Sequence, residues 1–181
     1  MTWDLPLSVK IGGQDFAIRD KCDYRVVLDA VAALSDIDLT DEQKVQCALF
    51  IFYEDAPDIP DYETAIREMF NIIRGGEDEE IGAERPKLMD WEHDFPQLAP
   101  PVGRVLGYDV RTPGRYTHWY TFLGGYMEIG DCTFSNIVTI RNKRTKGIKL
   151  EKWELEFYRN HRKLVDIPIK LTAEEKALLG C

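Results

Sequence analysis

The chain has 181 residues and a formal net charge of -9, with 44% hydrophobic and 30% charged residues. This composition predicts a folded core and excludes disorder over most of the chain, and the length suits one domain or two small ones. No apolar run approaches the roughly 20 residues that span a bilayer, and residues 1–13 lack the residue order of a signal peptide. We therefore expect a protein that stays in the cytoplasm where it is made, with no membrane partner.

The charge is unevenly distributed along the chain. Residues 1–98 contain 9 Lys and Arg against 23 Asp and Glu, whereas residues 99–181 contain 14 against 9. The acidic first half would repel a phosphate backbone, so a nucleic-acid partner is not expected. Residues 141–163 nevertheless contain nine Lys and Arg against three Glu. This basic segment needs an explanation of its own.

The N-terminal residues predict a β-hairpin. Residues 7–11 and 15–19 alternate apolar and polar side chains on either side of Gly12 and Gly13. Glycine can take the positive φ angles that a tight turn requires. A lone hairpin is marginally stable in water, so we expect helices to pack on it.

Three helices are predicted between the hairpin and residue 76. Their apolar residues recur at helical spacing, and Thr40 with Gln43 forms a capping-box pattern before the second helix. That helix is so apolar near its end that most of its faces should be covered, and we expect Cys47 in the core. The predicted helices run from Asp23 to Leu34, from Thr40 to Tyr53 and from Asp61 to Arg74.

Residues 77–87 are interpreted as a linker because they begin with a charged, glycine-containing run, EDEEIGAE. Residues 1–76 and 88–181 then form two subdomains. In the second, Pro96, Pro100 and Pro101 predict short helical pieces, since each proline removes a backbone donor and clashes with the preceding turn. Further helices are expected from Thr112–Pro113 to Gly124–Gly125, from Asp131 through Ile140, from Leu150 to Leu164 and from Thr172 to Leu179.

The predicted fold is therefore mainly α in the α+β class. A small N-terminal β-hairpin has helices packed on it, and a second helical subdomain follows.

No constellation for catalysis or cofactor binding emerges from the sequence. His93, His118 and His161 lie in three separate segments, and no pair of cysteines has metal-ligand spacing. Residues 92–94 (EHD) could suggest a proton relay, but neighbouring side chains on a helix diverge, which favours a solvated polar face. Nucleotide-binding glycine motifs are absent from the sequence. We expect no enzyme activity, no catalytic residue, no metal and no cofactor.

Four short motifs follow one another in the second half, at residues 90–94 (DWEHD), 107–110 (GYDV), 118–123 (HWYTFL) and 137–141 (IVTIR). In their order and spacing, roughly residues 88–165 resemble the gene product fifteen family of phages that infect Gram-positive bacteria. The likeness departs from the family pattern at the three prolines, where the family normally has a continuous helix, and in the Gly-Tyr order of the motif at 107–110. The first half looks like short proteins encoded just upstream of the tape-measure gene in long-tailed phages.

This resemblance implies a tail assembly chaperone in the host cytoplasm, absent from the mature virion. Its partners would be the tape-measure protein and possible tail-tube subunits, and a helix-in-groove mode would suit them. The basic segment could meet acidic stripes on such a partner or on the first half of a neighbouring copy, giving a homo-oligomer. The candidate partner-binding residues, all expected to be exposed, are Arg141, Lys143, Arg144, Lys146 and Lys149.

Three alternatives remain open at this point. The basic residues could be no more than a solvated helix face. The protein could also be a structural virion component, such as a tail-completion or connector protein. A small hydrolase or nuclease is disfavoured because the required constellation is missing.

Overall fold

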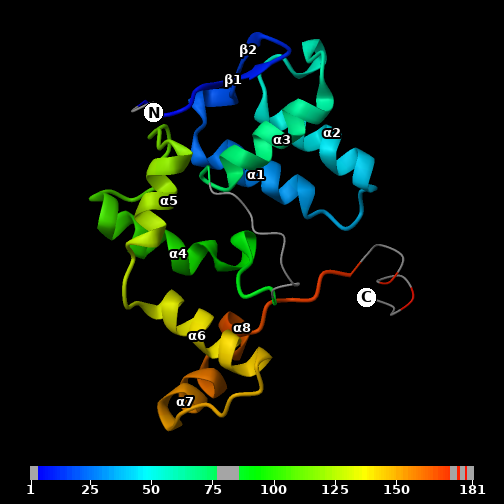
Figure 1. Ribbon diagram of the computed structural model, residues 1–181. Coiled ribbons are helices and arrows are strands. Elements are labelled where there is room, and N and C mark those ends of the chain that lie inside the picture. Colours follow the sequence, from blue (N-terminus) through cyan, green and yellow to red (C-terminus); the bar gives the residue numbers. More distant parts are fainter. Residues whose placement is uncertain (1–3, 77–85, 172–174, 176–177, 179–181) are drawn as a thin grey trace. The chain divides into compact units, whose positions relative to one another are not determined.

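The computed structural model describes residues 4–76 and 86–171, together with residues 175 and 178 (Figure 1). The chain forms two compact units. Unit 1 draws on residues 1–80, 116–124 and 170–181, and unit 2 on residues 81–115 and 125–169. The protein is mainly helical with one antiparallel hairpin, which confirms the predicted fold class. None of the described helices is both long and apolar enough to cross a membrane.

Unit 1 begins with the predicted hairpin. Strands β1 (Ser8–Ile11) and β2 (Gln14–Ala17) pair antiparallel, with Val9 opposite Phe16. Gly12 and Gly13 form the turn at φ angles of 59° and 86°, which glycine adopts without the steric penalty of a Cβ atom. Val9 and Phe16 are buried, so this face of the hairpin joins the core of unit 1.

The chain then makes a left-handed turn that includes the 3-10 helix η1 (Arg19–Lys21). Asp20, Lys21 and Cys22 have consecutive φ angles of 49°, 57° and 61°. For residues that have a Cβ atom, the left-handed conformation raises the conformational energy by roughly 1–2 kcal/mol each. Tyr116 stabilises the turn, because its hydroxyl donates to the Lys21 carbonyl over 2.8 Å. The Arg19 guanidinium adds three hydrogen bonds, to the carbonyls of Phe50, Ile51 and Tyr53.

The three predicted helices of unit 1 are confirmed, and each has its side-chain cap at the residue where the prediction placed its start. The side chains of Asp23, Thr40 and Asp61 accept backbone N–H groups, and Thr40 forms the predicted capping box with Gln43. A short 3-10 helix, η2 (Ala56–Asp58), joins the second helix to the third. The helices are α1 (Tyr24–Leu34), α2 (Asp41–Phe52) and α3 (Tyr62–Ile73).

The expected burial of Cys47 is wrong, because only one face of α2 is covered by the rest of unit 1. Ala48, Leu49 and Phe52 are buried, whereas Cys47 is exposed and Phe50 is 52% exposed. Cys47 lies on the side of the helix opposite the buried residues, as the spacing of 100° per residue requires. Overall apolarity therefore predicted the helix but not which of its faces is covered.

Residues 116–124 pack in unit 1, although the sequence placed them in the second subdomain. Helix α5 (Trp119–Met127) begins here. The Trp119 indole N–H donates to the carbonyls of Ile72 and Ile73, each over 3.0 Å. Phe122 stacks on Tyr24 with ring centroids 4.4 Å apart. These contacts join residues that lie between 46 and 98 positions apart in the sequence, so local periodicity carries no sign of them.

The predicted start and end of this helix are wrong. Thr112 and Pro113 lie in turns, and α5 begins at Trp119, where the Tyr120 N–H donates to His118 Nδ1 over 3.0 Å. The helix also continues through Gly124 and Gly125 to Met127. Glycine lowers the stability of a helix interior without breaking it.

Unit 2 begins with one continuous helix, α4 (Trp91–Leu106), so the predicted short pieces are wrong. Pro96 and Pro100 are both exposed, four residues apart on the same face of α4. Around these two prolines, water can reach the backbone carbonyls that lose their internal donors. Pro101 is buried, and the helix continues through it as well.

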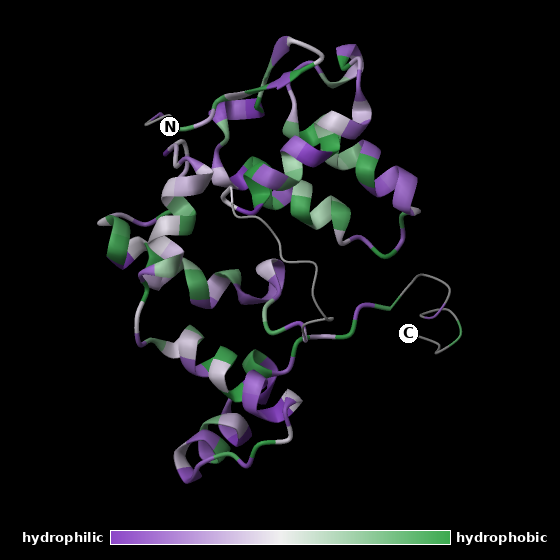
Figure 2. Ribbon diagram, in the orientation of Figure 1, coloured by the Kyte–Doolittle hydropathy of each residue, from purple (hydrophilic) through white to green (hydrophobic). Residues whose placement is uncertain are grey.

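Three further helices complete unit 2. Cys132, rather than the predicted Asp131, caps the first of them through Ser135, and the predicted helix 150–164 is divided at His161, where φ is -126°. Ile137, Ile140 and Val165 form the buried centre of this cluster, while Figure 2 shows that most of the α7 ribbon is hydrophilic. The helices are α6 (Thr133–Thr145), α7 (Lys152–Asn160) and α8 (Arg162–Val165). Most of the helix predicted for residues 172–179 lies outside the described residues, as do residues 77–85 of the predicted linker.

Candidate protein-binding surface

The five candidate residues lie in α6 and in the connection from α6 to α7, but they do not share one environment. Arg141 is buried, Lys143 is half-buried, and Arg144, Lys146 and Lys149 are exposed. The expectation that all five are exposed is therefore wrong for Arg141. The structure separates residues that hold unit 2 together from residues that face solvent.

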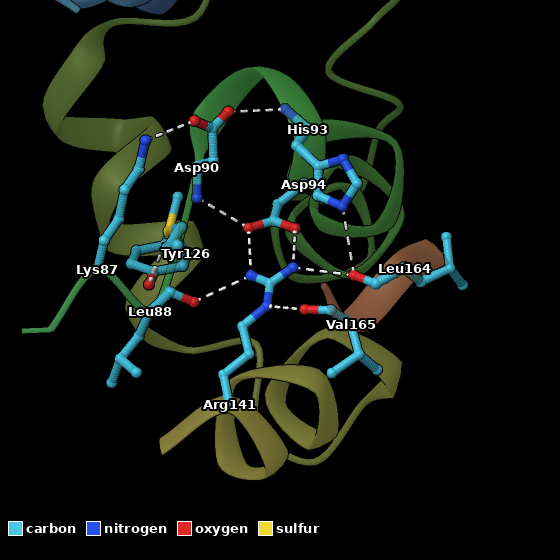
Figure 3. A network of polar contacts seen from close by, with 10 residues as sticks. Lys87, Leu88, Asp90, His93, Asp94, Tyr126, Arg141, Leu164 and Val165 are labelled. Atoms are coloured by element: carbon cyan, nitrogen blue, oxygen red, sulfur yellow. Dashed lines mark hydrogen bonds and ion pairs between the residues drawn. The ribbon is translucent and has the colours of Figure 1, made fainter. Parts of the chain in front are cut away.

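Arg141 forms a buried ion pair with Asp94, and the two side chains are 5% and 2% exposed. The guanidinium Nη1 lies 2.6 Å from Asp94 Oδ2, and Nη2 lies 2.8 Å from Oδ1. Such a bidentate pair uses the planar geometry of both groups. In Figure 3 the two side chains face each other between α4 and α6. The remaining donors of Arg141 bind the carbonyls of Leu88, Leu164 and Val165.

The same network fixes the start of α4. Asp94 accepts the backbone N–H of Asp90 over 2.9 Å, and the Asp90 carboxylate accepts the N–H of His93 and the ammonium group of Lys87. His93 Nε2 lies 3.4 Å from the Leu164 carbonyl oxygen. The expected solvated polar face at residues 92–94 is therefore wrong for Asp94, whereas Glu92 is exposed.

Lys143 pairs with a buried carboxylate. Its ammonium group lies 2.6 Å from Glu154, whose side chain is 1% exposed, and 3.5 Å from Glu151. The hydrogen bond to Glu154 raises the pKa of Lys143. Burial favours the neutral form of Glu154, but hydrogen bonds from Lys143 and from the Glu151 N–H outweigh it and lower the Glu154 pKa. Lys143 thus holds α7 against α6.

Arg144 takes part in a more exposed cluster around Asp166. Asp166 accepts hydrogen bonds from Arg144, Arg162 and the Tyr158 hydroxyl. Burial alone would raise the Asp166 pKa. The hydrogen bonds from these three donors outweigh burial, so the pKa is lowered. The Arg144 guanidinium also lies over the Tyr158 ring, 4.2 Å from its centroid.

Lys146 and Lys149 are the candidates available to a partner. Both are exposed, and neither side chain forms an ion pair or hydrogen bond with another described residue. Lys152, at the start of α7, is also exposed, and its side chain also lacks a described partner, although it is not one of the five predicted residues. Ile148 lies between them in the sequence and is 51% exposed, and Trp153 is 47% exposed. Ile148 and Trp153, apolar residues within a basic stretch of sequence, could have indicated that the site continues to Lys152.

A chemical site is not evident in the part of the chain that the structure describes. No three His, Cys, Asp or Glu side chains there are grouped to hold a metal ion, and every buried side-chain nitrogen or oxygen has a hydrogen-bond partner. Cys22 is buried, and burial raises the pKa of its thiol to about 12. A thiol in that state is a poor nucleophile.

The fold and surface define a small helical protein with a basic, partly apolar exposed segment. The model of the bacteriophage Gp15 protein family matches residues 1–104, which is more than half of the chain. The chain belongs to this family, and it is therefore a phage-associated protein. Comparisons with curated proteins and with solved structures found no match.

The matched residues differ from those on which the resemblance was based. The family match includes the motif at residues 90–94 but ends before the motifs at 107–110, 118–123 and 137–141. It includes instead the hairpin and the acidic helices of unit 1. The family prediction is confirmed, while the assignment of its likeness to residues 88–165 is not supported beyond residue 104.

Proposed function

We propose that this protein is a tail assembly chaperone that acts in the host cytoplasm and leaves no copy in the mature virion. Its partners are the tape-measure protein and tail-tube subunits, bound during tail morphogenesis. It acts by non-covalent binding and has no enzyme activity. Membership of a bacteriophage family supports the phage setting of this proposal.

The observation that carries the binding role is the exposed segment between α6 and α7. Lys146, Lys149 and Lys152 have no partner among the described residues, and Ile148 and Trp153 beside them are about half exposed. A protein interface usually combines an apolar centre with a polar, solvent-accessible rim. The acidic residues of unit 1 would meanwhile keep a loaded chaperone soluble.

The proposal is tested by co-expressing the chain with the protein encoded immediately downstream of its gene. A chaperone should co-purify with that protein and increase its soluble fraction. Failure of the two proteins to co-purify at low salt would contradict the binding role.

Mass spectrometry of purified particles separates a chaperone from a permanent virion component. We expect the chain to be absent or present in trace amounts. Recovery at a fixed stoichiometry in mature particles would show instead that it is a structural component, such as a tail-completion or connector protein.

A further inference from the structure

The connection between α6 and α7 presents an excess of positive charge. Residues 143–152 (KRTKGIKLEK) contain five Lys and Arg and one Glu. Lys143 and Arg144 are paired with Glu154 and Asp166. The positive charge left without an internal partner belongs to Lys146, Lys149 and Lys152.

Unit 1 carries a segment of opposite charge and similar length. Residues 54–63 (EDAPDIPDYE) contain five carboxylates and no Lys or Arg. All five are exposed, and Tyr62 among them is 49% exposed. Ile59 is buried, which fixes the segment on the surface of unit 1. The side-chain and backbone hydrogen bonds from Thr64 lower the Asp61 pKa, so this carboxylate stays ionised at neutral pH.

We propose that the acidic segment 54–63 of one copy docks on the basic segment 143–152 of a second copy. Five exposed carboxylates would face three lysines that have no internal partner, and the half-exposed Tyr62 and Ile148 supply apolar groups to the contact. Complementary charge gives such a contact its orientation and its rate of formation. Because the two surfaces are different, the contact is heterologous, and copies add head to tail. This inference does not depend on the proposed role in tail assembly, although it uses the same three lysines, so a second copy and a tail partner would compete for them.

Sedimentation velocity of the full chain tests the proposal. Charges act over about 30 Å at 0.01 M salt but over about 3 Å at 1 M. We expect the sedimentation coefficient to increase with protein concentration at the lower salt and to be that of a monomer at the higher salt. A monomer at every concentration in low salt would overturn the proposal. The same result is expected if the two segments pair within one chain, so that outcome also counts against it.

Two neutralised variants identify the surfaces. The basic-segment variant carries Lys146→Gln, Lys149→Gln and Lys152→Gln, and the acidic-segment variant carries Glu54→Gln, Asp55→Asn and Asp58→Asn. None of these changes removes a side-chain cap of an α-helix. We expect each variant alone to be monomeric and an equimolar mixture to form 1:1 dimers that grow no further. Continued association of either variant alone would refute the pairing.

A third variant controls for the loss of positive charge. Lys10→Gln, Lys21→Gln and Arg67→Gln remove the same charge from exposed positions in unit 1, and this variant should associate at least as strongly as the native chain. A monomeric control would show that net charge, rather than the two segments, governs association. Binding of a short duplex DNA by a native chain that stays monomeric would assign the basic segment to nucleic acid and overturn the proposal.

Discussion

Arg141 shows why charge in a sequence does not by itself locate a binding residue. It lies in the most basic part of the chain, yet its guanidinium binds internal groups, namely the Asp94 carboxylate and three backbone carbonyls. Asp94 is 47 residues away in sequence. The local pattern therefore indicated a surface cation where tertiary contacts make a buried pair.

Replacing Arg141 with Met should lower the free energy of unfolding by about 3–5 kcal/mol, because it leaves the Asp94 carboxylate buried without its partner. Urea denaturation followed by circular dichroism measures this change. Lys149→Met is the matched control and should change stability by no more than about 0.5 kcal/mol. Adding Asp94→Leu to Arg141→Met should restore part of the loss. Equal, small effects of Arg141→Met and Lys149→Met would show that Arg141 is not buried.

The left-handed turn at residues 20–22 offers a stabilising substitution. Lys21 is exposed with φ of 57°, so Lys21→Gly should raise the free energy of unfolding by up to about 1 kcal/mol after the entropic cost of glycine. Lys44→Gly, inside α2, should lower it by about 1 kcal/mol. Thermal unfolding of both variants measures the contrast, and a loss of stability in Lys21→Gly would contradict this backbone geometry.

At the scale of elements, the sequence predicted best where local chemistry decides the structure. Caps and apolar spacing predicted α1, α2 and α3 with nearly correct ends. The rule that proline breaks helices failed for α4, because Pro96 and Pro100 lie on its exposed face. The start of α5 was missed for a different reason. It depends on pairing of residues 117–119 with residues 22–24, which are far away in sequence.

Two helical glycines should respond in opposite ways to alanine. Gly124 in α5 has open space where a Cβ atom would lie, so Gly124→Ala should raise the free energy of unfolding by about 1 kcal/mol. At Gly103 in α4, the added Cβ atom would lie 2.8 Å from the Tyr108 carbonyl oxygen, so Gly103→Ala should destabilise the protein. Chemical denaturation of the two variants gives the signs, and stabilisation by Gly103→Ala would rule out this close approach.

The contact between α6 and α7 predicts a dependence of stability on pH. The folded-state pKa of Glu154 lies below its ordinary value of 4.5. Its ionised form therefore stabilises the fold above about pH 4.5, and this contribution is lost as the pH falls through the lower folded pKa. Stability should decrease less steeply below about pH 4.5 in Glu154→Gln than in the native chain. Glu156→Gln, at an exposed position of the same helix, should leave the native slope unchanged. Parallel curves for the native chain and Glu154→Gln would contradict the pairing with Lys143.

At the scale of the whole molecule, charge is divided between two units that each have their own core. Of the described Asp and Glu residues, 16 lie in unit 1 and 10 in unit 2, and unit 2 holds the basic segment. The sequence predicted this asymmetry of charge. It did not predict that residues 116–124 pack in unit 1, since the contacts of Trp119 with α3 connect distant parts of the chain.

In the proposed function, Lys146, Lys149 and Lys152 bind the partner protein. The most direct measurement is the fraction of the downstream-encoded protein that co-purifies with a variant in which all three are changed to Glu. A control variant with Lys10→Glu, Lys21→Glu and Arg67→Glu has the same net charge. We predict that the first variant loses the partner at low salt, that the control retains it, and that both keep native stability within about 0.5 kcal/mol per substitution. Equal recovery of the partner with both variants would contradict the claim.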